Sequence, residues 1–234
     1  MVGRERGLDH PALVRVLESA ARLQQLVPDA VLVGGSAAAL HAGHRDSYDH
    51  DHVLSDLAER FDAVLEALES QDGWVTNRVT PGKIILGELG GIETGVRQLI
   101  RRTPLEVARI SLPGGQQVVA PTPQEALRVK AFLTVRRNQT RDYLDVAALA
   151  EHLGTGAAAR TLASIDEYYA DQHLGGDGVA SQLARQLADP RPKDRSTTTQ
   201  LHRYKNLVSR WHDWSGVVAA CREVATAMVW GLEE

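Results

Sequence analysis

The sequence has a single cysteine, Cys221, so no intramolecular disulfide can form. That cysteine lies in an apolar stretch with helical periodicity, which predicts a buried packing residue rather than a nucleophile. No apolar run reaches the roughly 18 to 20 residues that span a bilayer. Residues 1–23 are charged and helical in pattern, unlike the basic start and apolar run of a signal peptide. We therefore predict a cytoplasmic protein without membrane contact.

The sequence also lacks an excess of basic residues. Its formal net charge is −4, which argues against general nucleic-acid binding by bulk charge. One segment, residues 181–214, nevertheless combines several Lys and Arg residues with Tyr204, Trp211 and Trp214. Such a segment can bind RNA through phosphate contacts and stacking, or it can be a solvated helix face with core tryptophans. Lys193 and Arg195 are its best candidates for RNA or nucleotide contact.

The chain of 234 residues is long enough for one large domain or two small ones. The first half alternates helical and strand patterns. Helices are expected at 10–26, at 36–43 with Ser36 as the N-cap, and at 55–70 with Ser55 as the N-cap. Strands are expected at 30–35, 48–54, 74–80, 83–89 and 92–99, with a hairpin at 107–121.

The pattern becomes helical after Pro121. Thr122 and Glu125 form a predicted capping box, with Pro123 at the first helical position. Further helices are predicted at 140–153 and 157–170, a turn at 175–178, a polar linker at 188–200, and helix from there to Trp230. The expected fold class is α+β, with a mixed sheet and flanking helices in a domain of residues 1–120 and a helical domain of residues 121–234.

The stretch "VGGSAAALHAGHRDSYDHDHVL" (33–54) carries the chemistry. A strand ends at two glycines and a helix begins at Ser36, so free helix-start amides beside Gly35 suit a phosphate group. Asp49 and Asp51 then share one face of the next strand. Mg²⁺ prefers carboxylates together with substrate phosphate oxygens. Phosphate beside a carboxylate pair is the minimal apparatus for metal-assisted nucleotidyl transfer.

The other face of this strand would carry His50 and His52. An H-x-H pair with Asp56 four residues later is a possible zinc site, but such sites need further His or Asp ligands nearby. We therefore favour a packed or solvent-facing role for both histidines, and His52 is a candidate for tuning the acidic site.

The segment 32–54 resembles the DNA polymerase β-like nucleotidyltransferase superfamily, and more narrowly the AbiEii-type nucleotidyltransferase toxins of abortive-infection and type IV toxin–antitoxin systems. The matching features are an apolar strand, Gly-Gly-Ser, a short helix ending near an arginine (Arg45), a serine and Asp-x-Asp. The segment "PTPQEALRVKAFLTVRRNQTRDYLDVAALAEHL" resembles the later motif of that family at Lys130, Arg137, Asp142 and Asp145. The similarity covers residues 28–153.

The residues of the second segment also suggest roles by themselves. Lys130 on an amphipathic helix can reach a triphosphate as a compact charge. Asp145 can hold Lys130 or take part in proton transfer. An ordinary ion pair between helices is the alternative. Asp142 shares a helix face with Asp145 and can also serve as a charge near the helix start.

The resemblance implies an Mg²⁺- or Mn²⁺-dependent enzyme that transfers NMP from an NTP to an RNA acceptor, with the tRNA 3′ end as the leading candidate and a cognate antitoxin as partner. It implies catalytic roles for Asp49, Asp51, Lys130 and Asp145, metal binding by Asp49 and Asp51, and nucleotide binding by Gly35, Ser36, Arg45 and Lys130. A small-molecule nucleotidyltransferase and a catalytically weak nucleotide-binding module are the alternatives.

The resemblance also implies a third carboxylate on a neighbouring strand. The matching stretch, "GGIETGVRQLI" (90–100), offers Glu93, whereas the usual position is closer to Gly95 or Arg97. Glu93 can substitute, or the third acid is absent, which would weaken binding of a second metal ion. Arg97 is then a candidate for phosphate contact.

Overall fold

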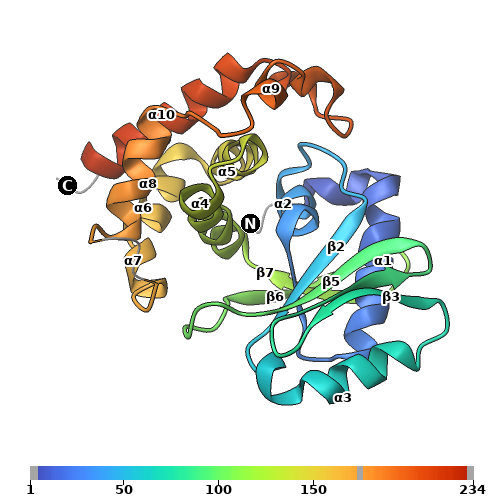
Figure 1. The fold of residues 1–234 in the computed structure, drawn as a ribbon. Coiled ribbons are helices and arrows are strands. Elements are labelled where there is room, and N and C mark those ends of the chain that lie inside the picture. Colours follow the sequence, from blue (N-terminus) through green and yellow to red (C-terminus); the bar gives the residue numbers. More distant parts are fainter. Residues whose placement is uncertain (1–4, 173–175, 231–234) are drawn as a thin grey trace. The chain divides into compact units, whose positions relative to one another are not determined.

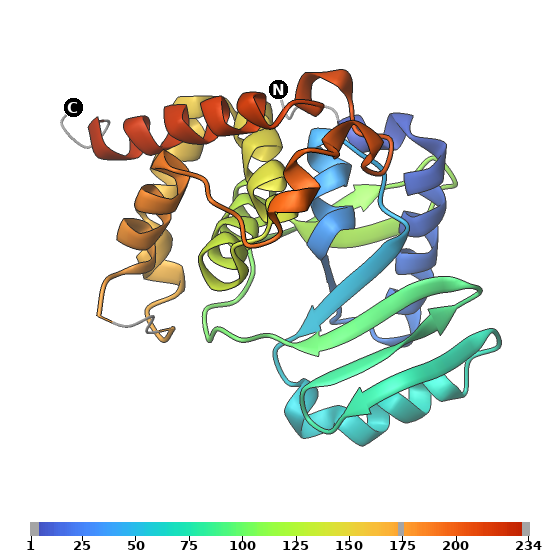
Figure 2. The same cartoon turned by 45° about the horizontal axis from the view of Figure 1, so that its top comes forward.

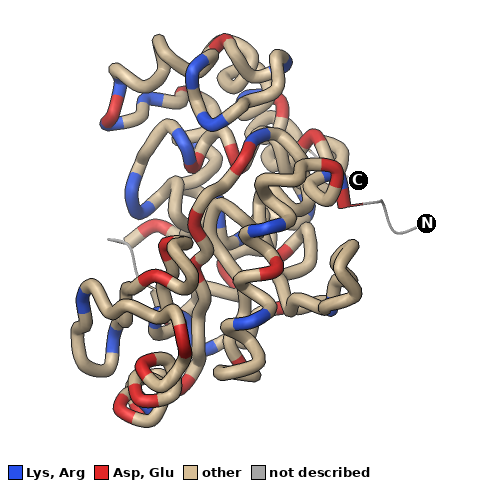
Figure 3. Tube along the Cα trace, turned by 90° about the vertical axis from the view of Figure 1, so that its right-hand side faces the viewer, with Lys and Arg blue, Asp and Glu red and all other residues tan. Residues whose placement is uncertain are grey.

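The structure, a computed structural model, describes residues 5–172 and 176–230 (Figure 1). The chain divides into two compact units, Met1–Thr122 and Pro123–Glu234. Acidic and basic residues are interspersed along the trace of both units (Figure 3). Among the described residues, no helix combines the length and the apolar character that crossing a membrane requires.

The first unit combines helices with strands. Its helical elements are η1 (Arg6–Asp9), α1 (Pro11–Leu26), α2 (Gly34–Ala42) and α3 (Leu57–Glu69). Its strands are β1 (Val31–Val33), β2 (Asp49–Leu54), β3 (Trp74–Thr80), β4 (Ile84–Leu89), β5 (Ile92–Gln98), β6 (Val107–Ser111) and β7 (Gln117–Pro121). The α+β fold class with a mixed sheet is confirmed.

Five strands form one mixed sheet in the order β1-β2-β5-β4-β3. Strand β2 is antiparallel to β1 and parallel to β5. The chain between β2 and β5 first forms the helix α3 and then the antiparallel hairpin β3–β4. β6 and β7 pair separately as a two-stranded sheet. Strand β2 lies between β1 and β5 in the five-stranded sheet, so its side chains have the β1–α2 turn on one side and β5 on the other.

One face of the five-stranded sheet is covered by α1 and α3, as Figure 2 shows. Leu57, Phe61 and Val64 of α3 join Leu54, Ile85 and Val96 of the strands in one buried cluster. Along β2 the residues at 50, 52 and 54 are buried, whereas those at 49, 51 and 53 are half-buried. The period of two therefore points His50 and His52 into the core and leaves the acidic face open.

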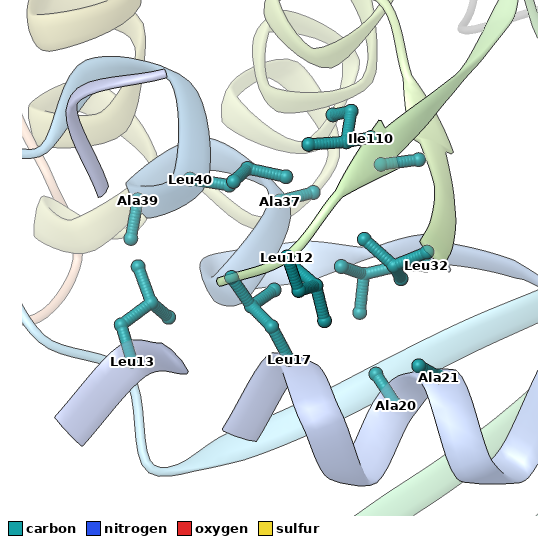
Figure 4. Packing of buried hydrophobic residues seen from close by; sticks show 12 residues of the cluster. Leu13, Leu17, Ala20, Ala21, Leu32, Ala37, Ala39, Leu40, Ile110 and Leu112 are labelled. Atoms are coloured by element: carbon teal, nitrogen blue, oxygen red, sulfur yellow. The ribbon is translucent and has the colours of Figure 1, made fainter. Parts of the chain in front are cut away.

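A second core cluster lies between α1, α2 and the hairpin β6–β7 (Figure 4). Leu13 and Leu17 of α1 pack toward Leu40 of α2 and Leu112 beside the hairpin. The side chain of Gln24 reinforces this packing, because its amide nitrogen donates to the Val119 carbonyl and its oxygen accepts from the Val119 amide, both at 2.8 Å. This core fixes α2, and hence the β1–α2 turn, against the sheet.

The second unit is helical. Its elements are α4 (Pro123–Arg137), α5 (Thr140–Leu153), α6 (Thr155–Ala163), α7 (Ile165–Tyr168), α8 (Val179–Ala188), α9 (Arg195–Thr198), η2 (Leu201–Arg203), η3 (Ser209–Trp211) and α10 (Trp214–Trp230). The single helix predicted for 157–170 is two helices that part at Ser164. The turn predicted at 175–178 lies partly outside the described residues.

The polar segment 188–200 is not a free linker. It includes α9, and hydrogen bonds join it to the corner between α4 and α5. Asn138 in that corner has φ +54°; its amide side chain donates to the Arg191 carbonyl, and its own carbonyl accepts from the Lys193 amide. Asp194 accepts from the Thr140 amide at 2.8 Å and so caps α5 from 54 residues away.

Two predicted N-caps are wrong. Helix α2 begins at Gly34, with Val33 as its N-cap, so Ser36 lies inside the helix. Helix α3 begins at Leu57, with Asp56 rather than Ser55 at the cap position. In α2 the cause is Gly34, whose φ of +76° lets the chain turn directly from strand into helix two residues before the first side chain that could cap it.

Candidate active site

The turn from β1 to α2 lies directly beside Asp51. Val33, the last residue of β1, pairs with Asp51 across the antiparallel ladder. A Cβ placed on Gly34 would lie 3.3 Å from Asp51 Oδ2, so the carboxylate approaches the backbone where α2 begins. The amides of a first helical turn have no partners within their own helix. The structure thus brings a candidate metal ligand next to a candidate phosphate-binding turn.

Asp49 is held by two serines. The Ser47 hydroxyl donates to Asp49 Oδ1 at 3.1 Å, and the Ser36 hydroxyl donates to the main-chain carbonyl of Asp49. Both serines are buried. The Ser36 side chain therefore ties α2 to β2, and what remains at this turn for a phosphate group is the backbone of Gly34 and Gly35.

Arg45 is packed against the same turn. It is buried, and its Nη1 donates to the Asp46 carbonyl at 3.0 Å. A Cβ on Gly35 would lie 2.8 Å from Arg45 Nη2 and 3.0 Å from Ser47 Oγ. Gly35 is therefore needed for the approach of this guanidinium to the start of α2, which places a positive charge beside the turn.

The parallel register with β5 decides which residues neighbour the acidic pair. Asp49 is paired with Glu93 and Asp51 with Gly95. Paired residues of neighbouring strands share a face, so Glu93, Gly95 and Arg97 lie on the side of the sheet that carries the two aspartates. Gly95 is required at its position, because a Cβ there would lie 2.4 Å from Asp51 Oδ1.

Arg97 makes the one charged contact that the structure gives for Asp51. Its Nε lies 3.3 Å from Asp51 Oδ1. The Asp51 side chain is 32% exposed and that of Arg97 41%, so the pair is open to solvent. Where the resemblance leads one to expect a third acid, the structure has a guanidinium.

Glu88 is a neighbour that the sequence analysis missed. It is paired with Glu93 across the β4–β5 ladder, and Glu93 is paired with Asp49, so three carboxylates share one row of the sheet. Within the described residues, however, no three or more His, Cys, Asp or Glu side chains converge well enough to hold a metal ion. The sequence feature that could have placed Glu88 beside Glu93 is the hairpin turn at Gly90 and Gly91, because it fixes which residues of β4 and β5 are paired.

The histidine face of β2 is closed. His50 Nε2 lies 3.1 Å from both Ser19 Oγ and Thr94 Oγ1, and burial lowers the pKa of His50 to about 4 against the opposing pull of Asp49. Burial also lowers the pKa of His52 well below its usual value, and its ring lies edge-on to that of His50 with centroids 5.2 Å apart. These neutral, packed rings leave the acidic face of β2 as the one that is partly open to solvent.

The donor set of the acidic face fits a hard divalent cation. Asp49 and Asp51 supply carboxylate oxygens on one face of one strand, and the Asp51 oxygens occupy the space that side chains at Gly34 and Gly95 would fill. Mg²⁺ usually takes one or two protein carboxylates and completes its shell with phosphate oxygens and water. A pair of aspartates beside a candidate phosphate-binding turn matches that requirement.

In the second unit, Lys130 lies between two buried acids. Its Nζ is 2.6 Å from Asp145 Oδ2 and 3.9 Å from Asp142 Oδ1, and both carboxylates are fully buried. Burial raises the pKa of Asp142, and Lys130 opposes that rise. The predicted ion pair between α4 and α5 is present, and it connects the two helices whatever further role its members have.

The basic segment 181–214 divides into core and surface residues. Trp211 is fully buried, and Trp214 packs edge-on against Tyr143 with ring centroids 6.0 Å apart. Trp211 thus belongs to the core of the helical unit, as one of the two interpretations predicted, whereas Trp214 is half-buried at its edge. Lys193 and Arg195 are exposed.

An open pocket lies in the same segment. Its lining consists of Ser196, Thr197, Gln200, Arg203 and Tyr204.

Cys221 is fully buried in α10, and burial raises the pKa of its thiol to about 12. Its sulfur lies 3.9 Å from the Tyr143 carbonyl. These surroundings agree with the predicted packing role and leave no thiolate for catalysis.

Comparison with known sequences finds no protein-family profile that matches the chain. The heme uptake protein MmpL11 of Mycobacterium tuberculosis is 31% identical over 243 aligned residues, which cover 92% of this chain and 22% of MmpL11. The mycolic acid-containing lipids exporter MmpL11 of Mycolicibacterium smegmatis is 36% identical over 129 residues, 55% of this chain and 13% of that protein. The chain thus spans about a fifth of the length of the first of these relatives.

Among solved structures, MenT4, a nucleotidyltransferase toxin from Mycobacterium tuberculosis H37Rv, superposes with a TM-score of 0.53. The superposition covers 93% of this chain and 83% of MenT4 at 16% sequence identity. The chain has a nucleotidyltransferase fold. In this fold the Asp-x-Asp strand and the glycine turn predicted from the sequence occupy neighbouring positions, as the ladder between β1 and β2 shows.

Proposed function

We propose that the chain is a metal-dependent nucleotidyltransferase that transfers a nucleoside monophosphate from an NTP to an acceptor and releases pyrophosphate. The observation that carries the proposal is the approach of the Asp51 carboxylate to the backbone at Gly34. A carboxylate at this distance from a helix start can share a cation with a phosphate group bound there. The nucleotidyltransferase fold supports the same conclusion.

In this proposal Asp49 and Asp51 would hold Mg²⁺ or Mn²⁺, which would supply charge stabilisation at the transferred phosphoryl group. The helix-start amides of α2 and the Arg45 guanidinium would favour the negative triphosphate. An acceptor hydroxyl would form a bond to the α-phosphorus and give up its proton to solvent, while the bond from the α-phosphorus to the oxygen that bridges to the β-phosphate breaks and pyrophosphate leaves. Lys130 and Asp145 are proposed to contribute to triphosphate binding, with Asp145 holding the Lys130 ammonium.

For the acceptor we propose RNA, with the tRNA 3′ end first, and for a partner a cognate antitoxin. The AbiEii-type resemblance of residues 28–153 supports both, and the fold shared with a toxin agrees with them. The exposed Lys193 and Arg195 are the proposed RNA contacts in the helical unit. We expect the protein to act in the cytoplasm.

Labelled transfer assays test this function. The chain would be incubated with each α-labelled NTP, Mg²⁺ or Mn²⁺, and either total tRNA or an aminoglycoside as acceptor. We expect label on tRNA, and we expect Asp49→Ala and Asp51→Ala to abolish it. Asp62→Ala, which removes an exposed acid on α3, is the matched control and should retain transfer.

Other outcomes distinguish the alternatives. Label on the aminoglycoside alone would show a small-molecule enzyme, and nucleotide binding without any transfer would show a binding module. Full transfer by Asp49→Ala and Asp51→Ala would show that the metal assignment is wrong. Growth arrest on expression, relieved by Asp49→Ala, would support the toxin assignment.

A further inference from the structure

Arg97 competes with any cation for the carboxylate of Asp51. Its Nε is 3.3 Å from Asp51 Oδ1, the same oxygen that lies where a Cβ of residue 95 would be. A guanidinium and a divalent cation cannot both be the near neighbour of one carboxylate oxygen without repelling each other. The affinity of the acidic pair for metal therefore depends on what Arg97 does.

The position of Arg97 follows from the register rather than from a flexible loop. It lies on β5 two residues beyond Gly95, opposite Val53 in the parallel ladder, and so on the face that carries Asp49 and Asp51. An acid at this place would add a ligand and negative charge. An arginine adds neither, and it places a positive charge there instead.

We propose that Arg97 limits the acidic pair to one divalent cation by occupying Asp51 as a built-in counter-cation. This inference rests on the proposed metal centre and specifies its stoichiometry. Both side chains are partly open to solvent, at 32% and 41% exposure, so the ion pair can separate. When a nucleotide with its cation binds, the guanidinium released from Asp51 is available to a phosphate oxygen.

The experiment is a Mn²⁺ titration of the nucleotide-free protein, with bound metal counted from the electron paramagnetic resonance of the free ion. Wild type should bind one Mn²⁺, and Asp49→Ala should abolish that binding. Arg97→Gln should bind Mn²⁺ about threefold to tenfold more tightly, because an adjacent positive charge is gone. Arg97→Glu should bind a second Mn²⁺, since it adds a carboxylate to the same face.

Two variants control for charge. Arg97→Lys retains the positive charge and should bind Mn²⁺ as wild type does. Arg78→Gln removes an exposed arginine from β3 of the same sheet and should leave the affinity unchanged.

The outcomes separate the two proposals. If wild type binds one Mn²⁺ that depends on Asp49, and Arg97→Gln and Arg97→Glu bind no better and no more of it, Arg97 does not limit the site and the inference is wrong. Two Mn²⁺ ions bound by wild type would overturn it as well. If no variant binds Mn²⁺ in a manner that depends on Asp49, the metal centre itself is wrong.

Discussion

Substitution of Lys130 by methionine should lower the free energy of unfolding by about 3 to 5 kcal/mol, because it breaks a buried ion pair from one side. The Lys130 ammonium is 2.6 Å from Asp145 and 3.9 Å from Asp142, and both carboxylates have no exposed surface. The three groups carry a formal charge of −1 together when ionised, and the substitution makes it −2. Methionine has a similar volume, so little of the loss comes from packing.

Substitution of both Lys130 and Asp145 should lower the free energy of unfolding by much less than the two single substitutions do together. In Lys130→Met/Asp145→Leu the buried charge of Asp145 is gone together with its cation, and replacement of a buried pair by apolar residues is often neutral. The buried carboxyl of Asp142 also loses Lys130 in this variant, so part of the loss in stability should remain. Urea unfolding followed by circular dichroism at pH 7 would measure the stability of wild type, Lys130→Met, Asp145→Leu and the double variant, which together form a double-mutant cycle. Lys83→Met, at an exposed position between β3 and β4, is the control and should change stability by less than about 0.5 kcal/mol.

A loss below about 1 kcal/mol in Lys130→Met, or a coupling energy near zero, would refute the assignment of Lys130 to a buried ion pair. The same series decides how transfer data on this residue are interpreted. If Lys130→Met is unfolded under assay conditions, its inactivity says nothing about the triphosphate. Lys130→Arg keeps the charge, and a folded Lys130→Arg variant that loses transfer would favour a direct role of the compact ammonium.

Three further predictions concern other parts of the fold. Gly95→Ala should weaken Mn²⁺ binding about tenfold, because its Cβ would lie 2.4 Å from Asp51 Oδ1, whereas Gly156→Ala in α6 should leave it unchanged. Asp194→Ala should lower the free energy of unfolding by about 1 kcal/mol in urea titrations, because α5 loses its cap. In the unfolded chain the thiol of Cys221 should ionise with its ordinary pKa of 9.0, whereas burial raises the pKa of this thiol in the folded chain to about 12. Stability should therefore fall between these pH values by up to about 1.4 kcal/mol per pH unit, and urea titrations of Cys221→Ala should lack this contribution.

Much of the fold was predictable because hydrophobic period and turn residues act locally. The strands 74–80, 84–89 and 92–98 match their predicted ranges to within a residue, since glycines mark the turns between them. The helix starts were less predictable. A serine near the start of a pattern favours an N-cap, but Ser36 bonds to the Asp49 carbonyl instead. That partner is 13 residues away and is chosen by tertiary packing.

The candidate site shows the same division. The strand period alone assigns Asp49 and Asp51 to the open face and the histidines to the core, and the burial pattern of β2 agrees. The contact of Arg97 with Asp51 depends on the parallel register of β2 and β5, which are far apart in the chain, and a single sequence does not contain that register. Glu88 joins the same row through a hairpin that the sequence does mark, but its place beside Asp49 depends on the β2–β5 register as well. The cap that Asp194 supplies to α5 escapes prediction for the same reason.

The glycines of the site have more than one physical purpose. From the sequence, Gly-Gly before a helix indicates close approach of phosphate to backbone. In the structure Gly34 also makes room for the Asp51 carboxylate from the side of β1, and Gly95 makes room for it from the side of β5. A surface acid surrounded by solvent gains little from a glycine on each side of its carboxylate, because it can rotate toward the water. Such glycines are useful where the orientation of that carboxylate matters, so the absence of side chains at 34 and 95 supports a binding role for Asp51 independently of the Asp-x-Asp pattern.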